Sequence, residues 1–276
     1  MIKFQEGTPD TMIERLRDAI SGFDRKWAGK CRPATEKQIQ RLENIVKKYH
    51  WELPDAYLRY LRAMGKNDAG LLENEWDGCE PGIDAILKLF EGSKNDSSVR
   101  RCLKEGNFLF SYNWGGSNFY LRLSETKADP PVVESVFANP EGKYVAGSFE
   151  KYLFRQAFKM YQETFKYHVS SDRSLCNHEE KGKEDCRTCS VYGETAKERM
   201  ETALQVTQAY GLEGAWFGDR VQYFWYDERY ALIINVRDGF RIEFSYNDAA
   251  LKEQFEWRVL DIRKTQEWLY QLISSQ

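Results

Sequence analysis

Histidine is scarce in this chain, with three residues, His50, His168 and His178, among 276. The sequence also lacks the Gly-x-Ser-x-Gly motif of a nucleophile elbow and a phosphate-binding glycine loop. Gly115-Gly116-Ser117 resembles such an elbow, but a Gly-Gly pair between two strands is typical of a hairpin turn. Because nucleophilic catalysis has so little support, we expect that the protein is not an enzyme.

Long apolar runs and a large charge excess are absent as well. No run approaches the length of about 18 apolar residues that a membrane span needs. Met1–Glu6 is followed by polar residues and not by the apolar segment of a secretory signal. The net charge of -3 gives no general support for nucleic-acid binding. We therefore expect a cytoplasmic protein with reduced cysteines, no nucleic acid and no membrane.

Aromatic residues, in contrast, are abundant at 14% of the chain. The length exceeds that of one typical domain and suggests two. A polar, charged stretch from about 168 to 193 is the best boundary. We predict a first domain at 1–167, a cysteine-containing linker at 168–193 and a small second domain at 194–276.

The order of helical and strand signals predicts the fold class. Thr11 and Thr35 each begin a capping-box pattern ahead of a helical apolar stripe. Strand patterns follow around 108–112 and 119–123, and Asp238-Gly239 later joins two strand-like segments as a hairpin turn. These patterns predict an α+β protein, in which helices pack on a mostly antiparallel sheet and a second, smaller α+β domain with a β-meander follows.

Four soft metal ligands lie close together in the predicted linker. They are Cys176, His178, Cys186 and Cys189. A Cys-x-x-Cys turn presents two thiolates to one metal, and the Cys-x-His pair can complete a tetrahedron around zinc. Such a closed site would be structural. Two other interpretations stay open: reduced cysteines in a mobile linker, and a redox Cys-x-x-Cys pair.

Some aromatic residues lie where a partner could reach them. Trp76, Trp114 and Tyr120 lie near loops or on the polar phase of strands, and Asn118 belongs to the same hairpin as Trp114 and Tyr120. Large aromatic side chains on one face would anchor a protein partner. The alternative is that these rings fill the space between the sheet and the helices.

An ordered set of local motifs in the first half of the chain resembles the SUKH superfamily. These motifs, spread over about residues 30–165, are Thr35-Glu36-Lys37-Gln38-Ile39, Leu53-Pro54-Asp55-Ala56-Tyr57, Phe108-Leu109-Phe110, Trp114-Gly115-Gly116-Ser117 and Gly147-Ser148-Phe149. The superfamily contains fungal cell-wall-assembly regulators and many bacterial toxin-immunity proteins. The resemblance implies an α+β fold and no shared catalytic residues.

The same resemblance implies a function based on protein binding. The first hypothesis is a bacterial immunity protein that neutralises a cognate toxin, such as a nuclease, by direct binding. Trp76, Trp114, Asn118 and Tyr120 are the predicted partner-binding residues. The alternatives are a regulatory scaffold in cell-wall assembly or signalling and a zinc-dependent enzyme. The sequence does not specify the toxin, the oligomeric state or the role of the second domain.

Overall fold

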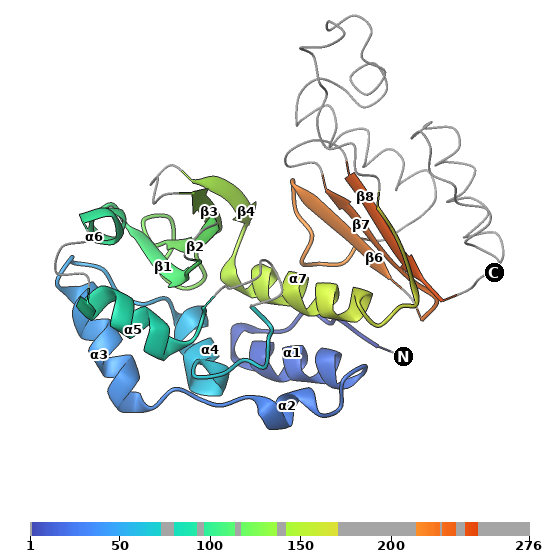
Figure 1. Ribbon diagram of the computed structural model, residues 1–276, viewed down its shortest axis with the longest axis horizontal. Coiled ribbons are helices and arrows are strands. Elements are labelled where there is room, and N and C mark those ends of the chain that lie inside the picture. Colours follow the sequence, from blue (N-terminus) through green and yellow to red (C-terminus); the bar gives the residue numbers. More distant parts are fainter. Residues whose placement is uncertain are drawn as a thin grey trace, which may run out of the picture. The chain divides into compact units, whose positions relative to one another are not determined.

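The computed structural model describes eight segments of the chain (Figure 1), at residues 2–72, 80–92, 97–113, 117–136, 142–170, 214–226, 228–235 and 241–247. By its internal contacts the chain divides into two compact units, residues 2–161 and residues 162–276. The predicted limits at 167 and 193 stay predictions, because most of the segment between them lies outside the described residues.

The first unit consists of helices followed by a sheet and a closing helix. Its elements are η1 (Pro9–Thr11), α1 (Met12–Ser21), α2 (Trp27–Lys30), α3 (Glu36–Lys47), α4 (Asp55–Met64), α5 (Ile83–Gly92), α6 (Ser97–Lys104), β1 (Asn107–Ser111), β2 (Ser117–Arg122), β3 (Val132–Val136), β4 (Lys143–Ala146) and α7 (Phe149–Gln162). Within the described ranges, no helix combines the length and the apolar character that crossing a membrane requires.

The two predicted capping boxes have different outcomes. At α3 the prediction is confirmed, because Gln38 N–H donates to Thr35 Oγ1 at 3.3 Å and Thr35 N–H donates to Gln38 Oε1 at 2.8 Å. At α1 it is wrong. Thr11 already has helical backbone angles at the end of η1, and its hydroxyl donates back to Thr8 O at 3.1 Å. Its side chain therefore does not cap the first turn of α1.

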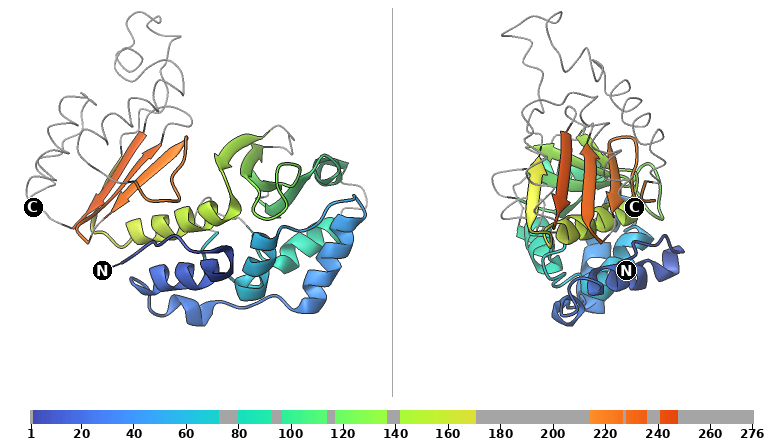
Figure 2. Two further views of the ribbon diagram at one scale, coloured as in Figure 1. Left: turned by 180° about the vertical axis from the view of Figure 1, so that it is seen from behind. Right: turned by 90° about the vertical axis from the view of Figure 1, so that its right-hand side faces the viewer.

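The sheet of the first unit is antiparallel throughout, with strand order β1-β2-β3-β4. Leu121 pairs with Phe108 on one side and with Val132 on the other, so these three side chains share a face. Helices α1, α3, α4, α5 and α7 lie on one side of the sheet, as the two opposite views agree (Figure 2). The predicted α+β class, helices on an antiparallel sheet, is confirmed.

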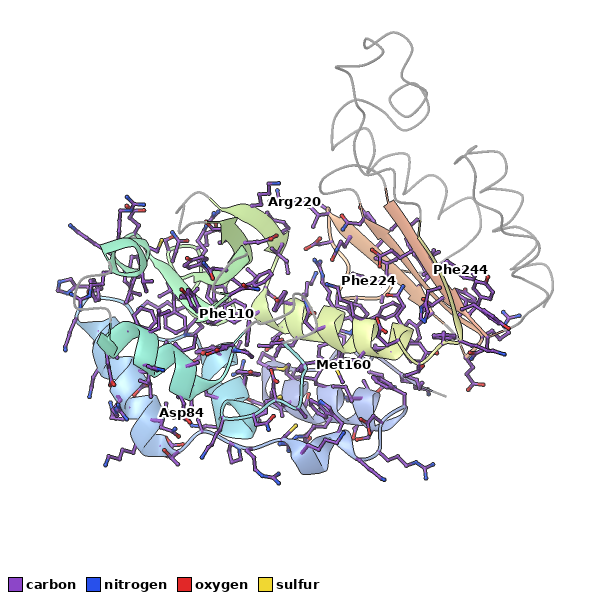
Figure 3. The ribbon with its side chains drawn as sticks, in the orientation of Figure 1. Asp84, Phe110, Met160, Arg220, Phe224 and Phe244 are labelled. Atoms are coloured by element: carbon purple, nitrogen blue, oxygen red, sulfur yellow. The ribbon has the colours of Figure 1, made fainter. Side chains whose placement is uncertain are left out.

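Aromatic rings fill the space between the sheet and these helices (Figure 3). Phe110 of β1 packs edge-on against Phe149 of α7, with ring centroids 5.2 Å apart, and against Tyr152 at 5.7 Å. On the α5 side, Phe108 stacks on Phe90 at 5.7 Å. Much of the high aromatic content of the first unit therefore forms the core.

The second unit contains a separate four-stranded antiparallel sheet in the order β5-β8-β7-β6. Its strands are β5 (Tyr167–Ser170), β6 (Gln222–Tyr226), β7 (Tyr230–Asn235) and β8 (Arg241–Tyr246). The predicted β-meander is present as β6-β7-β8, although Asp238 and Gly239 lie outside the described residues. Phe224, Trp225, Phe244 and Tyr246 are buried, so these rings belong to the core of the described sheet.

Candidate functional site

The sequence motifs that resemble the SUKH superfamily meet in one buried aromatic cluster. Tyr57 of the Leu53-Pro54 motif lies 5.3 Å from the ring of Phe108 and 5.5 Å from the ring of Phe149. All three side chains are fully buried. These three aromatic residues of the motifs therefore belong to the core of the first unit.

Two helices of this core begin beside the same loop, which runs from Leu123 to Pro131. The carbonyl of Ala128 accepts the N–H of Ala56 in the first turn of α4 at 3.0 Å. At α7, Asp129 Oδ1 accepts the N–H of Glu150 at 3.1 Å. The loop thus satisfies one orphan amide of each helix, and a carboxylate at a helix N-terminus is further favoured by the helix dipole.

Around the start of α7 the loop, α4 and α7 form a partly buried charged cluster. Arg59 Nη2 of α4 lies 3.2 Å from Glu150 Oε1, and both side chains are largely buried. Ser148 Oγ accepts the N–H of Lys151 at 3.2 Å, as the sequence predicts for a helix cap. Arg59, Asp129, Ser148 and Glu150 together form what we call the α7 latch.

Both carboxyl groups of the latch have raised pKa values. Burial raises the pKa of Asp129, opposed by hydrogen bonds from Ser148 and from backbone amides. Burial also raises the pKa of Glu150, and the nearby Asp129 carboxylate raises it further while Arg59 opposes the shift. Both carboxyl groups are committed to contacts within the domain, so the latch is an element of structure and not a catalytic acid–base pair.

The raised pKa values of the latch predict a pH dependence of stability. Because the folded chain holds these protons more tightly than the unfolded chain, the contribution of the latch is largest at low pH. It declines as the pH rises above the ordinary values of 3.8 for Asp129 and 4.5 for Glu150.

Urea unfolding of the wild type and of the double variant Asp129→Asn/Glu150→Gln would measure this effect. The difference in unfolding free energy should shift in favour of the wild type when the pH is lowered from about 7 to about 4. A shift in the opposite direction would show that the two carboxyl groups have lowered pKa values in the folded chain.

A second buried carboxylate organises the turn after α4. Asp68 Oδ2 accepts from the hydroxyl of Tyr60 at 2.9 Å and from the N–H of Leu72 at 3.1 Å, while its Oδ1 accepts from the N–H of Gly70 at 3.1 Å. Burial raises the pKa of Asp68, and these hydrogen bonds oppose that shift. Asp68 therefore fixes the path of the chain where it leaves α4.

The described residues include two of the four predicted partner-binding side chains. Asn118 is 8% exposed, and its Oδ1 accepts the N–H of Asn113 at 2.9 Å. Tyr120 is 2% exposed and lies on the face of β2 opposite to Phe119, whose ring contacts α7. Neither residue offers a partner much accessible surface. Trp76 and Trp114 lie outside the described residues, and partner binding by all four stays a prediction.

The predicted metal ligands Cys176, His178, Cys186 and Cys189 also lie outside the described residues. Among the residues that are described, no group of three or more His, Cys, Asp or Glu side chains is placed to hold a metal ion. Cys31 and Cys102 are buried.

Sequence reasoning did not find the α7 latch. Asp129 sits in Asp129-Pro130-Pro131, which the sequence indicates only as an interruption of the sheet. Asp129 accepts the N–H of Glu150, which lies 21 residues later in the chain. Glu150 in turn pairs with Arg59, which lies far earlier. The one local signal was Ser148 as a helix cap, and it says nothing about which carboxylate approaches that helix.

Comparison with known proteins agrees with this architecture. The model of the SMI1 / KNR4 family (SUKH-1) matches residues 33–155. This segment begins at Pro33, between α2 and α3, ends within α7 and contains the whole antiparallel sheet of the first unit. No curated protein and no solved structure matches the chain.

The resemblance to the SUKH superfamily that the motifs predict is confirmed for residues 33–155, which match the model of the SMI1 / KNR4 family (SUKH-1). This match is consistent with a non-enzymatic immunity or regulatory module that acts by binding a protein.

Proposed function

We propose that this protein is a bacterial immunity protein that binds a cognate toxin, such as a nuclease, and thereby blocks its active site or substrate channel. The observation that carries the proposal is the match of residues 33–155 to the SUKH-1 family. The α7 latch agrees with it, because its two carboxyl groups with raised pKa values contact other groups of the same domain. The proposed location is the cytoplasm.

Co-expression tests this function directly. The toxin domain encoded beside this gene would be expressed with and without the full chain, and growth and co-purification would be scored. We expect rescue of growth together with a stable complex, because occlusion requires a lasting contact. Failure of both would contradict the immunity function for that toxin and favour a regulatory scaffold in cell-wall assembly or signalling.

The same assay tests the proposed anchors Trp76 and Trp114. Buried aromatic anchors often carry much of the energy of an interface, so Trp76→Ala and Trp114→Ala should each weaken the complex by about tenfold or more. Asn118→Ala and Tyr120→Ala form the comparison, because these residues are buried and their replacement acts through folding. If both tryptophan variants bind as the wild type does, the anchors lie elsewhere.

We also propose that Cys176, His178, Cys186 and Cys189 hold a structural zinc ion. Three thiolates and one imidazole are a donor set that zinc prefers, and four protein ligands close the coordination sphere. The purified full chain should contain one equivalent of zinc, and Cys186→Ser/Cys189→Ser should lose it. If the purified chain contains no zinc, the zinc proposal fails, and the alternatives are reduced linker cysteines or a redox Cys-x-x-Cys pair. Zinc with a bound water in place of a protein ligand would instead favour a zinc-dependent enzyme.

A further inference from the structure

A short segment that contains α2 connects α1 to α3 in the first unit. Trp27 is fully buried and anchors this segment, while Lys26 N–H donates to Asp24 Oδ1 at 2.9 Å. Arg32 Nη1 donates to the carbonyl of Gly29 at 2.7 Å and closes the other end. We call residues 24–32 the basic knob.

The exposed side chains of the basic knob are mostly cationic. They are Arg25, Lys26, Lys30 and Arg32. Lys66, also exposed, follows α4 and lies beside them, because its N–H donates to the carbonyl of Arg32 at 3.0 Å. The backbone of Arg32 and Asn67 pairs as an isolated antiparallel bridge, so Lys66 is held next to the knob by the fold.

Two acidic residues near this surface, Asp24 and Glu36, already pair with cations. Asp24 lies 3.7 Å from Lys30 Nζ, and Glu36 lies 3.2 Å from Arg62 Nε. Within the described part of the chain, no carboxylate comes within ion-pair distance of Lys26, Arg32 or Lys66. Residues 24–37 carry five cationic and two acidic side chains in a chain whose net charge is -3. Residues 24–37 are therefore net positive, although the chain as a whole is net negative.

We propose that the basic knob together with Lys66 is a docking surface for an acidic face of a protein partner. This inference rests on the proposed function, because it names the chemistry of the partner that such a binding module recognises. Clustered, uncompensated cations attract an acidic face, speed its association and fix its orientation. The buried Trp27 and the backbone hydrogen bonds between Arg32, Lys66 and Asn67 fix the backbone of the knob, so binding orders only its side chains.

Nucleic acid fits this surface less well than an acidic protein. Binding of single strands uses exposed aromatic rings for base stacking, and the one aromatic residue of the knob, Trp27, is buried. The net negative charge of the chain also opposes a polyanion that extends beyond the knob. A short acidic stretch on a folded protein matches both the small area and the local charge.

The test compares two variants of the full chain with the same net charge. In the first, Arg25, Lys26, Arg32 and Lys66 are replaced by glutamine. In the control, four exposed lysines from other places, Lys3, Lys47, Lys48 and Lys88, are replaced by glutamine. The probe is a fluorescent poly-glutamate peptide, followed by anisotropy at low salt. Equal thermal midpoints of the two variants and the wild type establish that all three are folded.

We expect the knob variant to bind the peptide about tenfold more weakly and the control variant less than about twofold more weakly. Equal weakening in both variants would attribute binding to net charge and overturn the proposal, as would unchanged binding by the knob variant. A DNA duplex that binds the wild type more tightly than the peptide does, and loses this affinity in the knob variant, would overturn it in favour of nucleic acid.

The experiment also separates this inference from the proposed immunity function, because the peptide assay contains no toxin. If the knob binds the peptide but the toxin is not neutralised, the immunity proposal alone fails. If the toxin is neutralised equally well by the wild type and by the knob variant, the knob proposal alone fails.

Discussion

Asp68→Ala should lower the free energy of unfolding by about 3–5 kcal/mol, because one small side chain satisfies three donors at the end of α4. The hydroxyl of Tyr60 and the amides of Gly70 and Leu72 all donate to its two carboxylate oxygens. Alanine would leave these groups without an acceptor in a place that water reaches poorly, since Asp68 is only 3% exposed. Chemical denaturation of the purified full chain measures the loss.

Asp68→Asn is the matched control for that experiment. Asparagine has nearly the same shape and keeps one oxygen acceptor, so we expect a loss of about half that of alanine. A cost below about 1 kcal/mol for alanine would show that the turn can rearrange to satisfy the three donors in another way. Equal costs for both variants would instead mean that the charge of Asp68, and not its acceptor geometry, stabilises the turn.

Phe110→Ala should also cost about 3–5 kcal/mol, through loss of buried area and through the cavity left behind. The ring of Phe110 is fully buried and contacts Phe149 and Tyr152 of α7 and Tyr57 of α4, with centroids between 5.2 and 6.3 Å away. Because these residues come from the separate motifs of the family, their joint packing couples the sheet to both helices.

Phe110→Leu provides the graded comparison, with an expected loss of roughly 1–2 kcal/mol because leucine fills much of the same volume. Urea unfolding followed by fluorescence and by circular dichroism should give coincident transitions within this unit. If alanine costs no more than leucine, the surrounding rings collapse into the space, and the cluster is less tightly packed than its ring contacts indicate.

The sequence predicts most of the regular elements of the first unit for identifiable physical reasons. The periodic stripe after Thr35 and the alternation around Phe119 are local patterns, and α3 and β2 follow them. The failed prediction at Thr11 has a local cause too, since the short η1 turn precedes α1 and occupies the Thr11 hydroxyl. A four-residue pattern cannot distinguish a cap from the last residue of a preceding turn.

The features that the sequence did not predict depend on contacts between distant segments. Asp129 reaches the start of α7, and Lys66 lies beside Arg32, only because the fold brings these segments together. For the same reason, the sequence does not show which side chains are exposed to solvent. Tyr120 lies in a strand with alternating pattern, but whether its face is covered depends on elements elsewhere in the chain, and the structure shows it buried.

The packing at the C-terminal end of α7 affects which fragments of this protein can fold. The family match begins at residue 33 and ends at 155, inside the helix. Beyond that point Phe158 and Tyr161 pack on Phe4, and Tyr161 also packs on Phe23, both from the segment that precedes the match. The recognisable family segment is therefore smaller than the piece of chain that can fold as a unit. An excised fragment covering only the match would cut α7 at residue 155 and remove this packing, so we expect a fragment of residues 2–161 to be more stable than one of residues 33–155.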